Sequence, residues 1–327
     1  MIGVVAIGRN EGRRLVRCLE SIAGQMPVVY VDSGSSDDSE NAAKQRGAVV
    51  VSLDLSRPFT AARARNEGFA ALRWVHPALE YVQFVDGDCE IQPGWLEKAR
   101  ATLEANSRLA VVCGRRRERY PDRSVYNRLC DIEWNTPVGK AGACGGDALV
   151  RVKAFDEIGG YNPAVIAGEE PEMCVRLREC GWEIERIDAE MTLHDADMMW
   201  FGQWWKRAVR AGHAYAEGAA MHGSGPTRHW VREVRSNWVW GLGLPVAILA
   251  AAWPTRGASL LLLGLYPLLG WKIARHMRLR KFGSSDARVF ALFCVIGKLP
   301  NALGQLRYHV MRLLGKRSRV IEYKGAA

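Results

Sequence analysis

The chain has 327 residues and a formal net charge of +10, which allows a large hydrophobic core and more than one domain. Its eight cysteines form no Cys-x-x-Cys pair, so we expect neither a disulfide framework nor a zinc site, and a reducing, cytosolic compartment fits best. The first residues are apolar without a basic leader, which predicts a strand there rather than a signal peptide.

The charge is unevenly distributed along the chain. Residues 1–198 contain 25 Lys and Arg against 31 Asp and Glu, a net charge of −6, whereas residues 199–327 contain 20 against 4, a net charge of +16. The basic part also contains the longest apolar runs, and this combination favours an anionic membrane surface as partner. Because no nucleic-acid-binding motif occurs, we expect no nucleic acid partner.

Strands and helices are expected to alternate through the acidic part, because short β-branched runs are separated by segments with helical spacing of apolar residues. The expected strands are 3–7, 27–32, 48–53, 81–85, 109–113, 148–151 and 182–187. The expected helices are 13–23, one ending near 46, 60–75, 93–106 and one starting near 169. The alternation predicts an α/β domain with a mostly parallel sheet and helices on both faces.

The strand at 81–85 leads directly into Asp86-Gly87-Asp88. Open α/β sheets bind ligands at the carboxyl ends of their strands, and Gly87 permits a tight turn that lets both carboxylates face one point. Two hard oxygen donors suit Mg²⁺ or Mn²⁺ that also holds a diphosphate. The alternative is an ordinary β-turn, since Asp-Gly is a common hairpin signal.

Polar residues also follow the second and third strands. Asp32 follows the second strand, where a carboxylate accepts hydrogen bonds from a ribose or base, although Asp is also an ordinary loop residue. In the helix after the third strand, Arg63 and Asn66 share a face and Arg65 points elsewhere. An exposed arginine is usually solvated, whereas one turned inward would approach phosphates or the acidic cluster.

Two segments in the middle of the chain are open to more than one interpretation. The charge run at 115–119 favours a solvated face, with contact to an anionic acceptor as the alternative. The segment 139–147 is glycine-rich and expected to be flexible, and Gly146 would let the backbone approach a ligand closely. Its glycine spacing does not match a phosphate-binding loop.

Two candidates lie near the end of the acidic part. Glu169, Glu170 and Glu172 surround Pro171 at an expected helix start, where the helix dipole relieves their repulsion. They serve either as helix caps or as a general base. His194 follows the last expected strand in an acidic setting, and both metal ligation and a structural role remain open for it.

In this order and spacing, the motifs resemble those of family 2 glycosyltransferases over residues 2 to about 215. The matching segments are Asp32, Arg65-Asn66, Asp86-Gly87-Asp88, Gly145-Gly146-Asp147 and Gly168-Glu169-Glu170. The resemblance implies a GT-A fold, a nucleotide-diphosphate sugar as donor and inversion at the anomeric carbon.

The resemblance also implies a role for each matching residue. The implied donor-binding residues are Asp32, Arg65, Asn66 and Asp86. Asp88 would bind Mg²⁺ or Mn²⁺, and His194 matches a histidine that in some relatives touches the metal or the diphosphate. Glu170 matches the catalytic base, which in the family is usually Asp. The alternates for the base or for an acceptor contact are Gly146, Asp147, Glu169 and Glu172.

The basic part is expected to attach the protein to a membrane. We expect a GT-A catalytic domain at 1–198, amphipathic interfacial helices at 199–236, a transmembrane helical hairpin at 237–274, and basic amphipathic helices with a tail at 275–327. The basic flanks of the hairpin place the catalytic domain on the cytoplasmic side of the inner membrane. Core helices of a soluble second domain are the alternative.

The expected reaction is the transfer of a single sugar to a hydroxyl of a membrane-proximal acceptor, such as a lipid-linked glycan, a glycolipid or an exopolysaccharide unit. Single transfer is favoured because Gln203-Trp204-Trp205 only loosely resembles the Gln-x-x-Arg-Trp motif of processive synthases. The alternatives are a nucleotidyltransferase and a non-catalytic membrane scaffold on a degenerate transferase fold.

Overall fold

The computed structural model describes residues 1–22, 26–316 and 320–321, and the chain divides into two compact units. One unit comprises residues 1–120 and 133–197 and contains the β-sheet; we call it the sheet unit. The other comprises residues 121–132 and 198–327 and is helical; we call it the helical unit.

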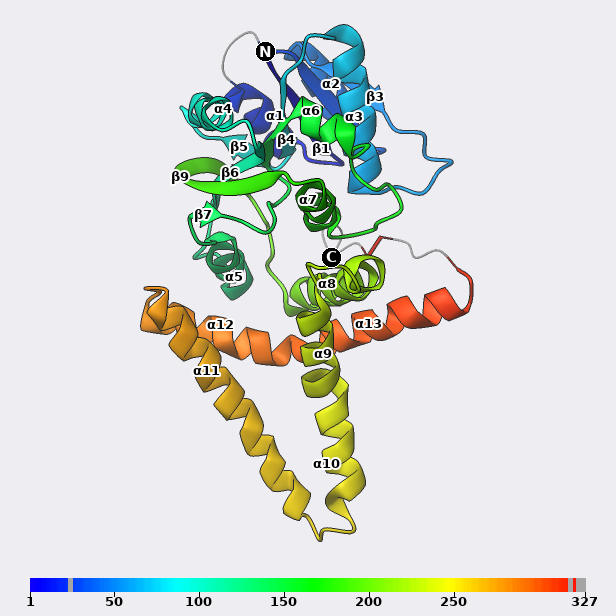
Figure 1. Cartoon of the computed structure of the whole chain (residues 1–327), viewed down its shortest axis with the longest axis vertical. Coiled ribbons are helices and arrows are strands. Elements are labelled where there is room, and N and C mark those ends of the chain that lie inside the picture. The colour runs from blue at the N-terminus through cyan, green and yellow to red at the C-terminus, as the bar shows by residue number, and fades with distance from the viewer. Residues whose placement is uncertain (23–25, 317–319, 322–327) are drawn as a thin grey trace. The chain divides into compact units, whose positions relative to one another are not determined.

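The described strands of the sheet unit form one mixed sheet in the order β3-β2-β1-β4-β8-β6-β9-β5, with β7 paired to β9 (Figure 1). The strands are β1 (Ile2–Gly8), β2 (Val28–Asp32), β3 (Val49–Ser52), β4 (Tyr81–Asp86), β5 (Cys89–Ile91), β6 (Leu109–Glu118), β7 (Gly139–Lys140), β8 (Ala148–Arg151) and β9 (Glu183–His194). From β3 to β4 all pairs are parallel, while β8 lies antiparallel between β4 and β6. The sequence predicted the strand at 148–151 but not its direction.

Helices connect the strands of the sheet unit. They are α1 (Arg13–Ser21), α2 (Ser39–Gln45), α3 (Ala61–Val75), α4 (Trp95–Ala105), α6 (Val152–Glu157) and α7 (Glu169–Glu179). The central strands β1 and β4 are buried along almost their whole length, as expected for strands with both faces covered. On one face α3 packs closely, because a Cβ at Gly68 would lie 2.6 Å from both Val5 and Val31.

One expectation about the sheet is wrong. The charge run at 115–119 was expected to be a solvated face. Its residues 115–118 instead form the end of β6, where Arg115 and Glu118 are buried. Strand β6 pairs with β9 over this segment, with irregular register between Cys113 and Arg116. Part of the charge run therefore points into the protein.

The helical unit contains a long hairpin and two further long helices. Its elements are α5 (Val125–Trp134, all but its last two residues), α8 (Phe201–His222), α9 (Val231–Trp238), the π-helical η1 (Val239–Gly243), α10 (Leu244–Ala252), the 3₁₀-helical η2 (Ala258–Gly264), α11 (Leu265–Leu279), α12 (Ser284–Ile296) and α13 (Lys298–Leu313). Figure 1 shows α9 and α10 as one arm and α11 as the other, joined at their far ends.

Among the described residues, one helix is long and apolar enough to cross a membrane. It is Ser284–Leu313, which comprises α12 and α13, and about a third of its most apolar window is buried. Within the predicted hairpin at 237–274, the α-helical stretches are shorter, because η1 and η2 interrupt them.

Helices α8 and α13 cross at glycines. A Cβ at Gly212 of α8 would lie 2.0 Å from the carbonyl oxygen of Asn301, and a Cβ at Gly304 of α13 would lie 2.0 Å from that of Val209. Side chains at these positions would overlap the facing backbone, so this close approach requires glycine on both helices.

We expect Gly212→Ala to lower the melting temperature of the protein, because overpacking a tight contact costs about 1–3 kcal/mol. The matched control is Gly202→Ala in the same helix, where a Cβ would meet nothing within 4 Å. Replacing an open helical glycine by alanine is neutral or stabilises by up to about 1 kcal/mol. Equal melting temperatures for the two variants in a thermal unfolding assay would contradict the crossing described above.

Candidate active site

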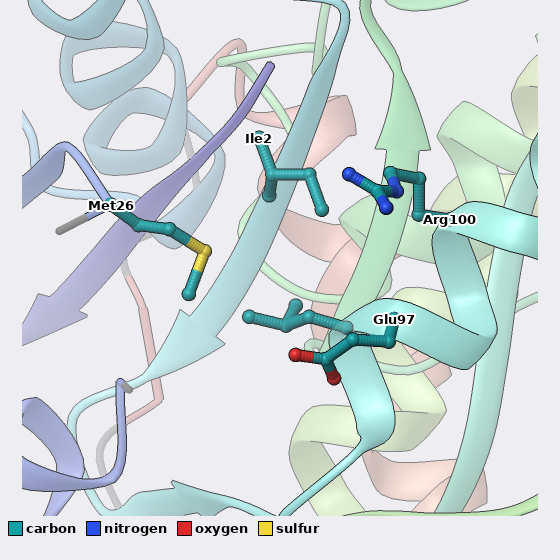
Figure 2. A pocket seen from close by; sticks show the side chains of 5 residues that line it. Ile2, Met26, Glu97 and Arg100 are labelled. Atoms are coloured by element: carbon teal, nitrogen blue, oxygen red, sulfur yellow. The ribbon is translucent and has the colours of Figure 1, made fainter. Parts of the chain in front are cut away.

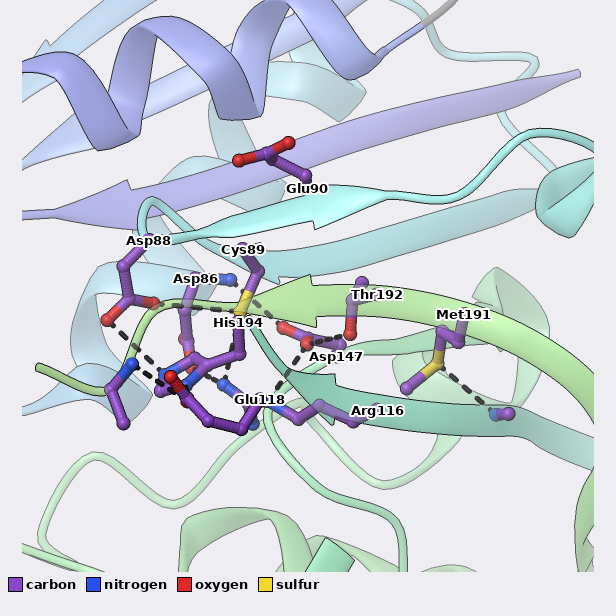
Figure 3. Close-up of polar contacts among 12 residues, drawn as sticks. Asp86, Asp88, Cys89, Glu90, Arg116, Glu118, Asp147, Met191, Thr192 and His194 are labelled. Atoms are coloured by element: carbon purple, nitrogen blue, oxygen red, sulfur yellow. Dashed lines mark hydrogen bonds and ion pairs between the residues drawn. The ribbon is translucent and has the colours of Figure 1, made fainter. Parts of the chain in front are cut away.

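The carboxylate of Asp86, at the end of β4, lies between two arginines. Its Oδ1 accepts a hydrogen bond from Arg65 Nη2 at 2.8 Å. Its Oδ2 accepts one from Arg116 Nη2 at 3.1 Å (Figure 3). Burial raises the pKa of Asp86, but the two guanidinium groups outweigh that effect and hold the pKa below its ordinary value. Asp86 is therefore a fixed anion at the carboxyl end of the central strand.

Asp147 fixes the end of β4 from a neighbouring loop. Its Oδ1 accepts the backbone N–H of Asp86 at 3.1 Å, and its Oδ2 accepts the hydroxyl of Thr192 at 2.6 Å. The same Oδ2 lies 3.3 Å from Arg116 Nε, and the side chain is fully buried. These contacts give Asp147 a positioning role, because its carboxylate is fully buried, whereas the Asp86 side chain is 28% exposed.

Asp88 and His194 come together where β5 pairs with β9. The pairing places Cys89 opposite His194, and Asp88 Oδ2 lies 3.3 Å from His194 Nε2 (Figure 3). The other ring nitrogen, Nδ1, lies 3.5 Å from Oε2 of Glu118 on β6. The ring of Trp134 meets the imidazole edge-on, with centroids 4.6 Å apart. The histidine is thus held on three sides, and its Nε2 faces the carboxylate.

The donor set at Asp88 fits a divalent cation. Ligand atoms of Asp88, Cys89 and His194 all lie within 4.8 Å of one another. Burial raises the pKa of the Cys89 thiol well above its usual range, and hard cations prefer oxygen to sulfur, so Asp88 and His194 are the better ligands of this group. A hard oxygen with an imidazole nitrogen suits Mn²⁺ or Mg²⁺ with further ligands from a substrate. A second group, Asp86, Cys89 and Asp147, has its carboxylates bound to Arg116.

Arg65 also binds the carboxylates at the start of α7. Its Nη1 lies 2.9 Å from Oε1 of Glu169 and 2.9 Å from Oε1 of Glu170. Gly168 precedes the helix with φ = 80°, a conformation that favours glycine. By contrast, Glu172 is bound by Arg176 one turn further along α7, at 2.8 Å, which stabilises the helix.

Glu170 is held in a setting that favours its protonated form. Burial and the neighbouring charge of Glu169 raise the pKa of Glu170 to about 7, although Arg65 opposes them. A carboxyl group with this pKa exchanges a proton readily at neutral pH, which suits a general base.

The backbone at Gly146 lines the same cluster. A Cβ there would lie 2.8 Å from Arg65 Nη2, 2.8 Å from Asp86 Oδ2 and 3.2 Å from Glu170 Oε1. Any side chain at this position would therefore intrude on the ion pairs that join Asp86 to Glu170.

Two predicted donor contacts hold loops in this structure. Asp32 Oδ2 accepts the backbone N–H groups of Gly34 at 2.9 Å and of Ser35 at 2.7 Å, and thereby closes the turn after β2. Asn66 exchanges two hydrogen bonds with the backbone of Tyr161, at 2.7 and 2.9 Å. Their roles toward a donor stay predictions.

The sequence reasoning missed Arg116 and Glu118. Continuing the two-residue alternation of the strand predicted at 109–113 would have placed both on one face. The irregular register between Cys113 and Arg116 disturbs that alternation, which is why the signal is weak.

A hollow lies at the opposite end of the central strands from these groups. Its volume is about 250 Å³, and it is lined by Ile2, Met26, Leu96, Glu97 and Arg100 (Figure 2). Ile2 begins β1, whereas Asp86 ends β4, its parallel neighbour, so this hollow is separate from the carboxylate site.

Residues 4–159 match the family described as Glycosyl transferase family 2. The chain contains a family 2 glycosyltransferase domain. This confirms the resemblance drawn from Asp86-Gly87-Asp88 and the other motifs, and it argues against a nucleotidyltransferase.

Two relatives among known proteins extend the likeness. Glycosyltransferase AglE of Haloferax volcanii is 21% identical over 225 residues, which cover 64% of this chain and 71% of that protein. A putative polypeptide N-acetylgalactosaminyltransferase of Drosophila melanogaster is 24% identical over 233 residues, which cover 59% of this chain and 41% of that protein.

Solved structures confirm the GT-A fold. A mannosyltransferase from Pyrobaculum calidifontis, in complex with GDP-Man and Mn²⁺, is similar over 93% of this chain and 86% of its own, with a TM-score of 0.61 and 18% identity. Glucosyl-3-phosphoglycerate synthase from Mycobacterium tuberculosis, in complex with phosphoglyceric acid, is similar over 69% of this chain and 81% of its own, with a TM-score of 0.51 and 18% identity. The chain therefore has the predicted α/β architecture.

The raised pKa of Glu170 predicts that the folded protein becomes less stable as the pH rises. Its pKa is about 7 in the folded protein against the ordinary glutamate value of 4.5, so the folded state binds this proton more tightly than the unfolded state. The resulting stabilisation is complete below about pH 4.5 and is lost as the pH rises through 7. It amounts to at most about 3 kcal/mol, at about 1.4 kcal/mol per pKa unit.

Glu170→Gln removes this ionisation. We expect the melting temperature of the variant relative to the parent to rise between pH 5 and pH 8 in a thermal unfolding series. Glu172→Gln is the control, because it removes the ion pair with Arg176 without touching Glu170 and should lower the melting temperature at both pH values. A pH-independent difference for Glu170→Gln would contradict the assignment.

Proposed function

We propose that the protein transfers one sugar from a nucleotide-diphosphate donor to a hydroxyl group of an acceptor, with inversion at the anomeric carbon and dependence on a divalent metal. The observation that carries this proposal is the ion-pair network through Arg65. It joins Asp86, at the end of the central strand, to Glu170, at the start of α7. A donor-side carboxylate and a candidate base are thereby held around one point.

On the donor side, Asp88 and His194 would hold Mg²⁺ or Mn²⁺. When bound, such a cation supplies charge neutralisation for the nucleoside diphosphate that leaves. Asp86 is oriented by Arg65 and Arg116 toward a ribose hydroxyl, with its carboxylate kept ionised so that it accepts hydrogen bonds. By resemblance to the family, Asp32 and Asn66 would also contact the donor on this side. Two similar solved structures, the mannosyltransferase and a complex of the M. tuberculosis synthase, carry Mn²⁺ together with GDP-Man or UDP.

On the acceptor side, Glu170 takes the proton of the acceptor hydroxyl as its oxygen attacks the anomeric carbon. The proton ends on the Glu170 carboxylate, and the sugar–phosphate bond breaks on the opposite side of that carbon. A pKa of about 7 leaves a large share of Glu170 ionised at neutral pH, yet makes its oxygen basic enough to accept the proton. Glu169 is the alternate, because it contacts the same nitrogen of Arg65.

We place the acceptor at a membrane, as a lipid-linked glycan, a glycolipid or an exopolysaccharide unit, with the catalytic domain on the cytoplasmic side of the inner membrane. The support is the net charge of +16 on residues 199–327 and the apolar helix Ser284–Leu313. Single transfer is favoured, because Gln203-Trp204-Trp205 only loosely resembles the Gln-x-x-Arg-Trp motif of processive synthases. In this structure Gln203 Oε1 accepts the backbone N–H groups of Met199 and Trp200 and thereby caps α8.

The decisive experiment compares Glu170→Gln with Glu169→Gln. We expect Glu170→Gln to keep nucleotide affinity and to lose turnover by about 10²–10⁴-fold, the usual contribution of a general base. Glu169→Gln should retain most of the turnover. The measurement is sugar transfer to a membrane extract, with nucleotide binding followed separately by calorimetry. Full turnover in Glu170→Gln together with loss in Glu169→Gln would move the base to Glu169.

A further inference from the structure

The two arms of the helical unit expose apolar side chains in nearly every direction. We call residues 239–271, which comprise η1, α10, η2 and the first part of α11, the hairpin. Its large exposed apolar residues are Val239, Val246, Leu249, Trp253, Leu260, Leu261, Leu262, Leu263, Leu268 and Trp271. Water-soluble surfaces rarely expose so much contiguous apolar area, so this surface has a partner.

The polar groups of the hairpin are satisfied by its own backbone. The hydroxyl of Ser259 donates to the carbonyl of Ile248 at 2.8 Å, that of Thr255 donates to Ala251 at 2.6 Å, and that of Tyr266 donates to Trp240 at 2.7 Å. Such internal pairing is what a hydrocarbon surrounding requires, because lipid tails offer no hydrogen bonds. A protein partner could form hydrogen bonds with free hydroxyl groups, so an interface with protein would not require this internal pairing. The pairing therefore favours lipid as the surrounding of the hairpin.

Charge is absent from the hairpin except at its tip. Between residues 237 and 271 the sequence contains one charged residue, Arg256, in the turn that joins the arms. Basic residues lie on both sides of this stretch: Arg228, Arg232 and Arg235 before it, and Lys272, Arg275 and Arg278 after it. Basic residues in these positions would bind anionic lipid headgroups at the base of the arms.

Tryptophan marks two levels along the arms. Trp238, Trp240 and Trp271 lie at the base, whereas Trp253 lies at the tip, 93% exposed, beside Arg256. From Trp238 to Trp253 a helix rises about 22 Å, at 1.5 Å per residue. This length exceeds the thickness of one leaflet but is somewhat shorter than the ~30 Å hydrocarbon core. Local thinning of the bilayer and extension of the Arg256 side chain toward the headgroups accommodate the difference. A tip that stopped at the bilayer centre would leave Arg256 in hydrocarbon, which is strongly unfavourable.

The helix Ser284–Leu313 meets a length and composition criterion for spanning, but its contacts place it across the arms. Lys298, in its middle, donates from Nζ to Ser236 Oγ at 3.0 Å and to Asn237 Oδ1 at 3.2 Å, both at the base of the first arm. Figure 1 shows α12 and α13 running across the ends of the arms that lie away from the tip. Two segments that cross in this way do not both traverse one bilayer.

We propose that the hairpin crosses the lipid bilayer, with residues 253–257 at the far headgroup layer, while α12 and α13 lie flat on the near surface. The charged residues of Ser284–Leu313, Arg288, Lys298, Arg307 and Arg312 among them, then remain at the polar interface. The open apolar hollow of about 540 Å³ along Trp238 to Ala247 is filled by lipid tails. This inference rests on the helical unit alone and stands apart from the proposed sugar transfer.

The test is the sidedness of two introduced cysteines in the full-length protein expressed in intact cells. Thr255→Cys lies at the tip and Ser285→Cys at the start of α12, and both positions are exposed. We expect a membrane-impermeant maleimide to label Thr255→Cys in intact cells and Ser285→Cys only after permeabilisation. The parent protein, with its native cysteines, gives the background. Labelling of both positions only after permeabilisation would overturn the crossing.

A second measurement guards against variants that fail to insert or fold. Leu249→Lys with Leu261→Lys places charges on the exposed faces of both arms, and we expect most of the protein to leave the membrane fraction. Trp74→Lys is the control, because Trp74 is 88% exposed on α3 of the sheet unit and should not affect retention. Recovery of the parent as a soluble dimer, without detergent, would show that a second copy covers the arms and would overturn the proposal.

Discussion

The site depends on the ion pairs that the buried guanidinium of Arg65 forms with three carboxylates. The Arg65 side chain is 3% exposed, and it contacts Asp86, Glu169 and Glu170 at 2.8 to 2.9 Å. A buried cation is tolerated only with anionic partners, and those carboxylates in turn need the cation. Loss of either side would leave uncompensated charge in the interior. The network therefore holds the end of β4 and the start of α7 in one arrangement.

The different protonation behaviour of Asp86 and Glu170 follows from the excess of carboxylates over arginines in this network. Arg65 and Arg116 face four carboxylates, those of Asp86, Asp147, Glu169 and Glu170. Asp86 takes one arginine on each oxygen and stays ionised, whereas Glu170 shares its arginine with Glu169 and holds its proton more tightly. One residue is thus fixed as a hydrogen-bond acceptor and the other is poised to exchange a proton. The two carboxylates thus differ because Asp86 pairs with both arginines, whereas Glu170 pairs with Arg65 alone.

Much of the site could be predicted from the sequence, because strand ends and helix starts carry local signals. The β-branched run before Asp86 predicts β4, and the cluster at Glu169 and Glu170 predicts a helix start, as the structure bears out. What could not be predicted is which partners these residues find. Arg65 turns inward by a choice of helix face that local spacing leaves open, and Arg116 depends on a register irregularity in β6 that no short motif reports. The direction of β8 could not be predicted from the sequence either. It runs antiparallel to β4, although its apolar residues resemble those of a parallel strand.

The sugar transfer proposed above requires Asp86, Asp88 and His194 to form a metal-dependent donor site. The most direct measurement is the melting temperature of the full-length protein in detergent with UDP, GDP or TDP, each with and without Mn²⁺. A ligand that binds only the folded state raises the midpoint by mass action. We expect a rise with one of these nucleotides that requires Mn²⁺ and disappears in Asp88→Ala. No rise with any of them, or a rise that Asp88→Ala retains in full, would contradict it.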